Sequence, residues 1–319
     1  MKSFIVTGGA GFIGSNLVDR LLADGHQVTV VDNFSTGQRR FIEQALSHQN
    51  CRLVEANLLN LDILKKTFEG NDAIFHFAAN ADVRFGTEHP RKDLEQNTIA
   101  TYNVLEAMRF NGIKRIVFSS TGSVYGEAKI IPTPEDAPFP LQTSLYGASK
   151  LAGEGLIAAY SEGFGFQSWI FRFVSILGER YTHGHVFDFY KQLKDDSTTL
   201  QVLGNGKQRK SYLYVQDCID AILLGMERST DKVNIFNLGV NSYCEVNDSI
   251  GWICEALGVN PMIKYSGGAR GWIGDNPFIF LETKKIRDLG FSPKLSIRDG
   301  VIKTIEYIKE NEWVLGERK

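Results

Sequence analysis

The sequence feature that most constrains the fold is a glycine-rich run close to the start of the chain. It follows the apolar segment 4–6, which predicts a buried strand, and it reads Thr7-Gly8-Gly9-Ala10-Gly11-Phe12-Ile13-Gly14. Apolar residues at helical spacing continue to Leu22, so the run joins a predicted strand to a predicted helix. Glycines spaced in this way allow a tight turn, a close approach of the backbone to a pyrophosphate, and close packing of the helix on the sheet. The free N–H groups at the helix N-terminus then predict a phosphate-binding site for a dinucleotide.

An acidic residue ends the second predicted strand. The strand covers residues 28–31, and Asp32 follows Gly14 by 18 residues. This spacing is close to the roughly 20 residues expected for the acid that binds the ribose hydroxyls of a dinucleotide. A carboxylate at this position repels a 2′-phosphate, so the sequence predicts NAD rather than NADP. Arg39 and Arg40 lie nearby and are interpreted as a solvated helix face, although arginine is also the residue type that NADP would require.

Strand-like and helix-like segments alternate over the first half of the chain. Further strands are expected at residues 52–54, 73–77, 115–118 and 168–173, with helices at about 92–110 and 146–160. Such alternation predicts a parallel sheet with helices on both faces, and the nearly continuous apolar strands support it. The expected fold class is α/β, with a Rossmann-type doubly wound parallel sheet that forms an NAD-binding domain over residues 1–175.

The alternation breaks after about residue 176. Helices are expected near residues 186–193, 215–227, 245–257 and 297–309, with short strands and longer loops between them. We expect a smaller C-terminal α/β substrate-binding domain, mainly residues 176–319, while part of 210–240 joins the first domain. Ligands of such sheets lie beyond the carboxyl ends of the strands, where this second domain would cover them.

Composition and charge exclude several classes of function. The chain has 35 Lys+Arg and 37 Asp+Glu, and its net charge of −2 gives no general field that would attract nucleic acid or an anionic membrane. No apolar run reaches the roughly 18 residues of a membrane span, and no signal-peptide pattern opens the sequence. The four cysteines and six histidines lack the spacing of a zinc site. We therefore expect reduced thiols, no metal, and a cytoplasmic protein.

A tyrosine and a lysine four residues apart predict acid–base chemistry. Tyr146 and Lys150 fall on one face of an expected helix, and an ammonium group beside a phenol lowers the pKa of the phenol from its usual value of about 10. Such a tyrosine exchanges a proton with a sugar hydroxyl near neutral pH. The hydroxyl-rich run 119–126 follows the fifth strand and offers hydrogen bonds to the reacting oxygen. Taken alone, the pair is also compatible with surface residues, and the run with a polar turn.

Two further strand ends have residues that suit a cofactor. Asn57-Leu58 follows the third strand, where a loop would touch an adenine, and Phe77-Ala78-Ala79 ends the fourth strand with small residues that let the backbone come close. Each segment is also compatible with an ordinary strand end.

Together these segments resemble the extended short-chain dehydrogenase/reductase family, in particular its nucleotide-sugar epimerase and dehydratase branch. The matching segments are TGGAGFIGSN at the start, VDN at 31–33, HFAA at 76–79, Asn97, FSSTGSVYG at 118–126, SLYGASK at 144–150 and LGFSPKLSIRDG at 289–300. The resemblance therefore runs along the whole chain. It implies bound NAD, a nucleoside-diphosphate sugar as substrate, and Thr121, Tyr146 and Lys150 as the catalytic set.

The resemblance also implies which residues hold the cofactor, several of which the patterns above had already indicated. The expected cofactor-binding set is Gly8, Gly11, Phe12, Ile13, Gly14, Asp32, Asn33, Asn57, Leu58, Phe77, Ala78, Ala79, Asn97, Ser119, Tyr146 and Lys150.

A homodimer is expected because related enzymes pair two helices across a two-fold axis. Both of the helices concerned look apolar on more than one side. The residues are Leu94, Val104, Leu105 and Met108 in the first helix, and Leu151, Leu156, Ile157 and Tyr160 in the second. The alternative is that both helices only pack on their own sheet.

Single residues favour one reaction within the family. Related dehydratases carry Thr-Asp-Glu before Val-Tyr-Gly, and these acids act on the leaving hydroxyl at C6, whereas this chain has Thr121-Gly122-Ser123. Decarboxylating relatives carry Glu at the position of Ser123, and UDP-hexose 4-epimerases have a hydroxyl, a small residue and a hydroxyl. The resemblance therefore favours NAD-dependent epimerisation at C4 of a nucleoside-diphosphate sugar of the UDP-glucose/UDP-galactose type, through a transient 4-keto intermediate.

Other readings of the sequence stay open. A nucleotide-sugar 4-dehydrogenase or 4-ketoreductase would use the same residues, and a 4,6-dehydratase would in addition expel water. A non-catalytic NAD-sensing regulator on this fold is the most distant alternative, since such proteins tend to lose the tyrosine or the lysine and both are present here.

The substrate-binding residues implied by the resemblance include three departures from the family pattern. Ser175 stands where Asn is usual, Lys210-Ser211-Tyr212 replaces Arg-Asp-Tyr, and the segment from Arg270 to Asp275 is two residues longer than Arg-x-Gly-Asp. Lysine meets a diphosphate as a point charge, without the bidentate fork of arginine. The departures bear on which nucleotide and sugar are accepted. The full expected set is Ser123, Tyr146, Ser175, His185, Val186, Lys210 and Arg270.

Overall fold

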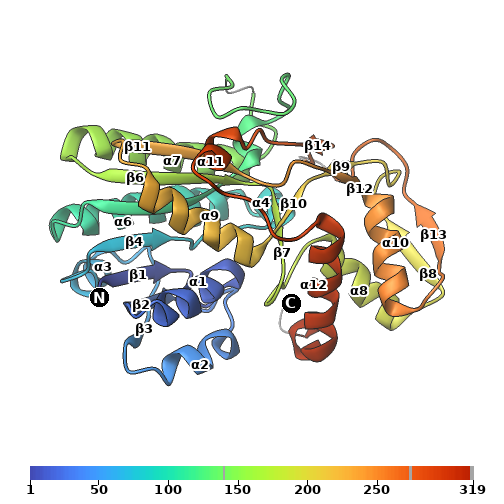
Figure 1. The fold of residues 1–319 in the computed structure, drawn as a ribbon, viewed down its shortest axis with the longest axis horizontal. Coiled ribbons are helices and arrows are strands. Elements are labelled where there is room, and N and C mark those ends of the chain that lie inside the picture. The colour runs from blue at the N-terminus through green and yellow to red at the C-terminus, as the bar shows by residue number, and fades with distance from the viewer. Residues whose placement is uncertain (139–140, 273–274, 317–319) are drawn as a thin grey trace.

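The computed structural model describes residues 1–138, 141–272 and 275–316. Its main sheet is parallel and runs in the order β11-β6-β5-β4-β1-β2-β3 (Figure 1). This is the Rossmann-type doubly wound sheet that the sequence predicts. Its strands are β1 (Ser3–Thr7), β2 (Gln27–Asp32), β3 (Cys51–Glu55), β4 (Ala73–His76), β5 (Arg115–Thr121), β6 (Gln167–Phe173) and β11 (Val233–Leu238).

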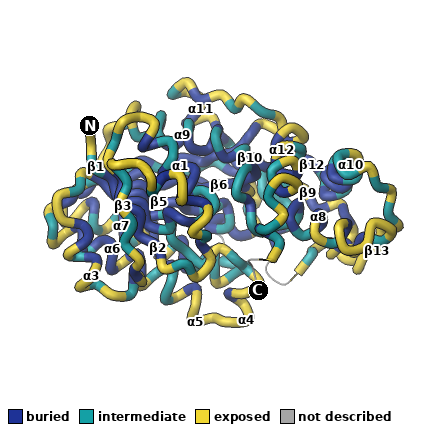
Figure 2. The backbone as a smooth tube through the Cα atoms, turned by 90° about the horizontal axis from the view of Figure 1, so that it is seen from below, coloured by how far each residue is buried: buried dark blue, intermediate teal, exposed yellow. Residues whose placement is uncertain are grey.

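Helices cover both faces of this sheet because successive strand side chains point to opposite sides. Phe4 and Val6 of β1 pack in the apolar layer that contains α1 and α9, whereas Ile5 packs in the layer that contains α3, α6 and α7. Figure 2 shows β5 and β6 inside the molecule, with exposed residues on the outer turns. The covering helices are α1 (Phe12–Ala23), α9 (Val215–Arg228), α3 (Leu61–Thr67), α6 (Ala100–Phe110) and α7 (Leu145–Phe164).

The strand order reverses at β1, which has β2 on one side and β4 on the other. The last residues of β1 and β4, Thr7 and His76, are register partners. The glycine-rich run therefore begins beside the segment that leaves β4. In open α/β sheets, ligands bind at such a reversal, outside the carboxyl ends of the strands.

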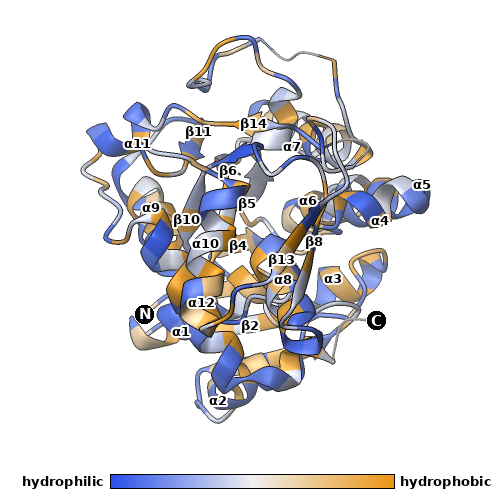
Figure 3. Ribbon diagram, turned by 90° about the vertical axis from the view of Figure 1, so that its right-hand side faces the viewer, coloured by the Kyte–Doolittle hydropathy of each residue, from blue (hydrophilic) through white to orange (hydrophobic). Residues whose placement is uncertain are grey.

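The C-terminal part forms small sheets and a group of helices on the right of Figure 1. Its strand pairs are β7 with β10, β9 with both β12 and β14, and β8 with β13. Helices α8, α10 and α12 pack on one another, and Figure 3 shows hydrophobic and hydrophilic residues on different sides of α12. The elements are β7 (Ser175–Leu177), α8 (His185–Asp195), β8 (Thr199–Val202), β9 (Arg209–Lys210), β10 (Tyr212–Tyr214), β12 (Cys244–Glu245), α10 (Val246–Leu257), β13 (Met262–Tyr265), β14 (Phe278–Ile279) and α12 (Ile297–Glu310).

One segment of the C-terminal half returns to the main sheet. Strand β11 pairs with β6 from Val233 opposite Ser168 to Leu238 opposite Phe173, and α9 packs on the same sheet. Both elements overlap residues 210–240, where such a return is expected. The domain division at residue 175 itself stays a prediction.

The helix expected at about 92–110 consists of three consecutive pieces. They are α5, which begins at Pro90, the π-helix η2, and α6. A π-turn within a helix is rare and occurs frequently at functional sites. The remaining short elements are η1 (Arg39–Ile42), α2 (Glu43–Leu46), α4 (Val83–Glu88), α5 (Pro90–Asp93), η2 (Leu94–Ile99), η3 (Gly122–Tyr125), α11 (Lys284–Asp288) and η4 (Glu312–Leu315).

The apolar residues that indicated more than one apolar side on these two helices differ in burial. Val104, Leu105, Met108 and Ile157 are completely buried and form the side that packs on the sheet, whereas Leu151, Leu156 and Tyr160 are partly exposed. Leu94 is exposed on η2. Any pairing face must therefore be built from residues such as Leu94.

Two general features are absent from the described part of the chain. None of its helices combines the length and the apolar character that a bilayer crossing requires. Its His, Cys, Asp and Glu side chains form no group of three that could hold a metal ion.

Candidate active site

Glycine shapes the loop between β1 and α1. Gly8 adopts a φ of +68°, and a Cβ there would lie 2.6 Å from the backbone nitrogen of Ala78, after β4. A Cβ on Gly14 would overlap the carbonyl oxygen of Gly8, so no larger residue fits where the helix approaches the strand. Helix α1 begins at Phe12 with no side-chain cap from Gly11 and no acidic residue in its first turn. Its first N–H groups are therefore available to an anion.

Asp32 ends β2 beside this loop. Its carboxylate accepts hydrogen bonds from the backbone N–H groups of Ala10 (2.9 Å) and Phe34 (2.8 Å). Burial raises the pKa of Asp32 above its usual value, and these two hydrogen bonds oppose the rise. Each carboxylate oxygen keeps a further lone pair, so Asp32 can also accept from ribose hydroxyls. Asn33 is exposed, and its side chain accepts from the N–H of Ser35 at 3.0 Å.

The ends of β3 and β4 differ in what they can offer a ligand. Asn57 is exposed, whereas Leu58 is buried and its carbonyl oxygen accepts from Asn103 Nδ2 at 2.9 Å. Residues 77–79 are partly exposed and lie beside Gly8. The segment after β4 is therefore well placed for a cofactor, while the Leu58 side chain faces the core.

Strand β5 and helix α7 bring the three predicted catalytic residues together. Lys150 is buried, and its Nζ donates to the carbonyl oxygen of Ser119 at 2.7 Å. One turn earlier, Tyr146 lies beside Thr121, whose side chain lowers the pKa of the phenol. Thr121 Oγ1 also donates to Ser123 Oγ (3.2 Å) and accepts from the Ser123 backbone N–H (3.1 Å). All these groups gather at the carboxyl end of β5.

The expected acidification of Tyr146 by Lys150 is wrong for the protein on its own. Burial raises the pKa of the Tyr146 phenol to about 12, and the Thr121 side chain offsets only part of this rise. Burial also lowers the pKa of Lys150 to about 7. The ammonium group donates to the carbonyl oxygen of Ser119, and no hydrogen bond joins it to the phenol among the described residues.

Asn97 joins the site from inside the protein. It is buried in η2, where its Oδ1 accepts from the Asn80 N–H (2.8 Å) and its Nδ2 donates to Ser149 Oγ (2.9 Å). The side-chain amide is thus hydrogen-bonded within the protein, and a contact with the cofactor stays a prediction. It connects η2 to the residue directly before Lys150.

Two residues expected to bind substrate lie in the interior of the C-terminal part. The Val186 side chain is completely buried in the core, so any contact with substrate would have to come from its backbone. The His185 ring is hydrogen-bonded to Ser249 Oγ (2.7 Å) and to the Tyr212 hydroxyl (3.1 Å). Burial lowers the pKa of His185 to about 3, so the ring is neutral. Both ring nitrogens are used within the fold, because the first turn of α8 packs against α10 and β10.

Three other substrate-binding candidates, Ser175, Lys210 and Arg270, lie in the small strands and loops of the C-terminal part. Lys210 Nζ donates to Asp275 Oδ1 at 2.8 Å, so the two motifs that depart from the family pattern meet. Arg270 forms an ion pair with Glu127, and both side chains are about half exposed. Ser175 is exposed at the start of β7, beside β10. Residues 273–274 of the lengthened segment lie outside the described part.

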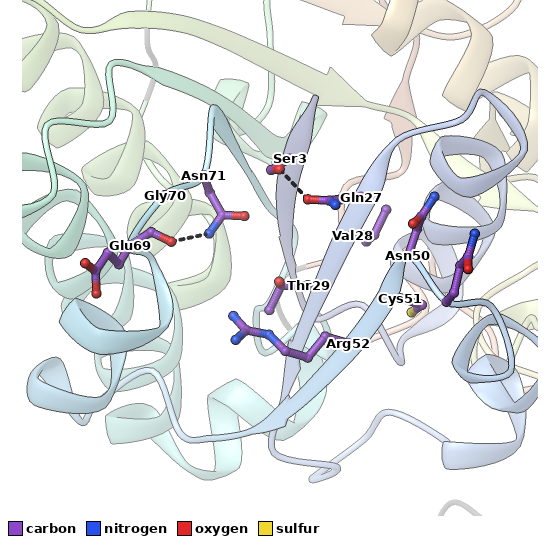
Figure 4. Close-up of a pocket in the computed structure, with 11 residues that line it drawn as sticks. Ser3, Gln27, Val28, Thr29, Asn50, Cys51, Arg52, Glu69, Gly70 and Asn71 are labelled. Carbon is purple, nitrogen blue, oxygen red and sulfur yellow. Dashed lines mark hydrogen bonds between the residues drawn. The ribbon is translucent and has the colours of Figure 1, made fainter. Parts of the chain in front are cut away.

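A surface hollow of about 260 Å³ lies at the opposite end of the main sheet (Figure 4). Ser3, Gln27 and Cys51 line it, and they are the first residues of β1, β2 and β3. The glycine loop and the predicted catalytic residues follow the carboxyl ends of parallel strands. The hollow is therefore not part of the site that they form.

Sequence reasoning missed a buried ion pair next to the site. Glu154 lies one turn after Lys150 on α7, and its Oε2 is 2.7 Å from Arg172 Nη2 on β6. Their side chains are 5% and 2% exposed. The sequence signal for this ion pair was Arg172, a charged residue inside the apolar segment 168–173, because a buried charge needs a partner.

The described residues fit a dinucleotide cofactor. The uncapped start of α1 and the glycine cradle suit a diphosphate, and Asp32 suits the hydroxyls of a ribose. The group formed by Thr121, Tyr146 and Lys150 lies at the carboxyl end of β5, which is two strands from β1 in the same sheet.

Comparisons with known proteins agree with this geometry. Residues 4–239 match the model of the NAD dependent epimerase/dehydratase family. A putative UDP-glucose 4-epimerase of Methanocaldococcus jannaschii is 32% identical over 315 residues, which are 96% of this chain and 98% of that protein. A solved UDP-galactose 4-epimerase is 36% identical with a TM-score of 0.87, over 98% of this chain and 100% of the other. A double mutant of a dTDP-glucose 4,6-dehydratase from Streptomyces venezuelae, solved with NAD bound, is 26% identical with a TM-score of 0.90 over 99% of both chains.

These relatives share one fold along almost the whole chain but differ in the reaction that they catalyse. Their agreement covers the sheet, the glycine loop and the C-terminal part together. NAD is accordingly the cofactor. The chain belongs to the NAD-dependent epimerase/dehydratase family, whose enzymes act on nucleotide sugars.

Proposed function

We propose that the protein interconverts a nucleoside-diphosphate sugar and its C4 epimer, with UDP-glucose and UDP-galactose as the substrate type. The turn after β5 carries the proposal: Thr121 and Ser123 present hydroxyls beside Tyr146, and only Gly122 separates them. Expulsion of a C6 hydroxyl needs an acid at this turn, and residues 118–126 contain no carboxylic acid. Similarity to 4-epimerases supports the same conclusion.

Tyr146 is the proposed base and acid. As a phenolate it removes the proton from the C4 hydroxyl, and as a phenol it returns a proton to the oxygen of the other epimer. Thr121, beside Tyr146, is placed to hydrogen-bond the same sugar oxygen. When bound, oxidised NAD supplies a hydride acceptor for the C4 hydrogen and a positive charge that favours the phenolate.

Lys150 has two proposed roles, which its geometry supports. Its ammonium group has three donors, and one of them is bonded to Ser119. The others can meet the hydroxyls of the cofactor ribose. Its charge also adds to the positive potential near Tyr146 when the lysine is protonated.

Inversion requires the 4-keto sugar to present its other face before the hydride returns. A substrate held mainly through its diphosphate leaves the sugar free to turn. Lys210 and Arg270 are the proposed diphosphate partners, because they are the cations of the two motifs that meet near β9. Ser175 and Ser123 are proposed to contact the substrate from β7 and from the turn after β5.

A second candidate function is a nucleotide-sugar 4-dehydrogenase or 4-ketoreductase. Thr121, Tyr146 and Lys150 would serve that reaction equally well, since it needs the same first step. A 4,6-dehydratase has support from the fold but none from Gly122 and Ser123. A regulator without chemistry is disfavoured because Tyr146 and Lys150 are both present and lie at one strand end.

The test is to incubate the purified protein with UDP-, GDP-, CDP- and dTDP-sugars and to identify the products by NMR. We expect at least one sugar to be converted to its C4 epimer with no net formation of NADH. Steady NADH formation would favour the dehydrogenase, and loss of water would favour the dehydratase. A panel that stays unchanged would contradict the proposed function.

A further inference from the structure

We propose that Glu154 is a positioning residue for the reaction, because it fixes the end of strand β5 against helix α7 and places a buried negative charge one helical turn from Lys150. The inference rests on the proposed function, since Thr121, Tyr146 and Lys150 are the groups that it would position. Glu154 acts through these groups and need not touch substrate or cofactor.

The first contact runs from Glu154 to β5. The Ser120 hydroxyl donates to Glu154 Oε1, and both residues are buried. Ser120 stands between Ser119, whose carbonyl oxygen accepts from Lys150 Nζ, and Thr121 of the proposed catalytic set. Helix α7 therefore contacts three consecutive residues at the end of β5, and the Glu154 contact lies between the other two.

Arg172 holds the other side of the Glu154 carboxylate. Its Nη2 donates to Oε2 at 2.7 Å, and its Nε lies 3.1 and 3.2 Å from the two oxygens. Arg172 Nη1 donates to the Tyr125 hydroxyl (2.6 Å) and to the carbonyl oxygen of Glu135 (2.9 Å). The Tyr125 hydroxyl in turn donates to Asn237 Oδ1 at 2.9 Å. The carboxylate cannot change rotamer without breaking several hydrogen bonds of this buried network.

The charge of Glu154 acts on Lys150 along one face of α7. Residues four apart on a helix are neighbours, with about 5–6 Å between their Cβ atoms. Glu154 favours the charged form of Lys150, and Asp93 of α5 does so as well. His76 of β4 also faces Lys150, but burial and the lysine charge lower the pKa of His76 to about 3, so it stays neutral. Arg172 is the cation that faces Glu154 from β6.

Folding stability alone does not account for this arrangement. Replacement of a buried ion pair by apolar residues of similar volume is often neutral or stabilising, because both charges lose their hydration. A purely structural pair would therefore be replaceable without loss of turnover. A positioning role predicts that the replaced protein folds but turns over poorly.

Matched variants separate these two roles. Glu154→Gln removes the charge and keeps the shape, Ser120→Ala removes only the hydrogen bond to β5, and Ser120→Thr retains a hydroxyl. Glu162→Gln is the control, because Glu162 lies on the same helix and pairs with Lys232 at the surface (2.7 Å). Glu154→Gln removes the carboxylate that pairs with Arg172, and this loss can prevent folding. In that case the double variant Glu154→Leu/Arg172→Met, which removes both charges, separates the two roles.

The first measurement is independent of turnover. NMR titration of isotope-labelled lysine Nζ groups reports the pKa of Lys150, with Lys150→Met used for assignment. In Glu154→Gln and in the double variant we expect the pKa of Lys150 to lie at least about 1 below that of the parent protein, because a nearby opposite charge is lost. Ser120→Ala and Glu162→Gln should leave this pKa unchanged.

The second measurement compares kcat with KM on the nucleotide sugar that the parent enzyme converts. Glu154→Gln, the double variant and Ser120→Ala should each lower kcat about tenfold or more while KM changes less than about twofold, because misplaced reacting groups slow the chemical step. Ser120→Thr should restore most of kcat, and Glu162→Gln should keep it.

A folded double variant with parental kcat and parental Lys150 pKa would overturn the inference. Failure of the parent protein to convert any nucleotide sugar would instead reject the proposed function. The Lys150 titration would still show in that case whether Glu154 controls the lysine charge.

Discussion

Lys150 Nζ lies 2.7 Å from the carbonyl oxygen of Ser119, so the lysine of helix α7 is bonded to the end of strand β5 rather than to Tyr146, one turn before it. Tyr146 reaches the same strand through Thr121. The separation of the phenol and the ammonium group is therefore set by the packing of α7 on β5. Burial raises the pKa of Tyr146 to about 12 and lowers that of Lys150 to about 7.

Tyr146→Phe should lower turnover by at least about 100-fold, because the proposed proton acceptor is removed. NAD content should stay unchanged, since the glycine loop and Asp32 are intact. Steady-state rates and the NAD released on denaturation are the measurements. Tyr160→Phe is the control: Tyr160 lies on the same helix and donates to Glu106 (2.7 Å), away from β5. Near-normal turnover of the Tyr146→Phe variant would show that Tyr146 is not the catalytic acid and base.

Asp32→Ala should weaken NAD binding by about 1.5–3 kcal/mol, or roughly 10- to 150-fold in Kd, because hydrogen bonds to a charged group are lost. Calorimetry on protein stripped of cofactor measures the effect. Asp24→Ala, at the exposed end of α1, is the control. We expect the purified parent protein to carry NAD(H). Retention of NADP in its place would contradict the role assigned to Asp32.

The protein should lose stability as the pH falls from 6.5 towards 3, in part through His76. Thr101 Oγ1 donates to the Asn97 carbonyl oxygen, so it accepts from His76 Nε2, and His76 Nδ1 accepts from Thr7. Burial and the charge of Lys150 lower the pKa of this neutral ring to about 3. The unfolded chain, with a histidine pKa near 6.5, binds the proton more readily, which favours unfolding below that pH.

Between pH 6.5 and pH 5 the contribution of His76 to this loss is about 2 kcal/mol. His76→Gln keeps a donor and an acceptor, so it should flatten the pH dependence by about that amount while lowering stability at pH 7. His48→Gln, at an exposed position, is the control. Urea unfolding at several pH values is the measurement, and an unchanged slope in His76→Gln would contradict the assignment.

The protein should be a homodimer that pairs through η2, α6 and α7. Four large apolar residues on η2 and α6 are exposed: Leu94 (53%), Ile99 (39%), Tyr102 (44%) and Phe110 (67%). Tyr102→Glu should produce monomers, because a charge would be buried at the interface. Met262→Glu, on the exposed strand β13, should not. Light scattering decides, and a monomeric parent protein at micromolar concentration would refute the pairing.

The part of the fold that local patterns determine was predictable. The glycine spacing from Gly8 to Gly14 and the apolar strands predict the sheet. The glycines must lie close to neighbouring backbone, and the apolar strand residues must be buried, whatever structure the rest of the chain forms. The position of β11 at the sheet edge was expected only as a segment within 210–240. Pairing with β6 depends on contacts between residues far apart in the sequence, for which one sequence gives no local signal.

The candidate site was predictable in its residue types more than in its contacts. The spacing of Tyr146 and Lys150 correctly predicts that they share a helix face, but it does not show that Lys150 donates to a backbone carbonyl. The sequence also did not show that the Val186 side chain packs in the core. The ion pair of Glu154 was missed because an acid one turn after a lysine usually marks a solvated helix face, although Arg172 within an apolar segment was a signal for it.

The fate of the C4 hydrogen tests the proposed epimerisation most directly. A substrate deuterated at C4 should give an isomer of unchanged mass, with inverted configuration and the deuterium still at C4, because the ketone that accepts the hydride is at C4. No solvent hydrogen should enter the carbon skeleton, since residues 118–126 offer no acid for elimination. NMR and mass spectrometry of the product measure both. A product lighter by one water, with deuterium at C6, would contradict the account, as would deuterium that leaves with free NADH.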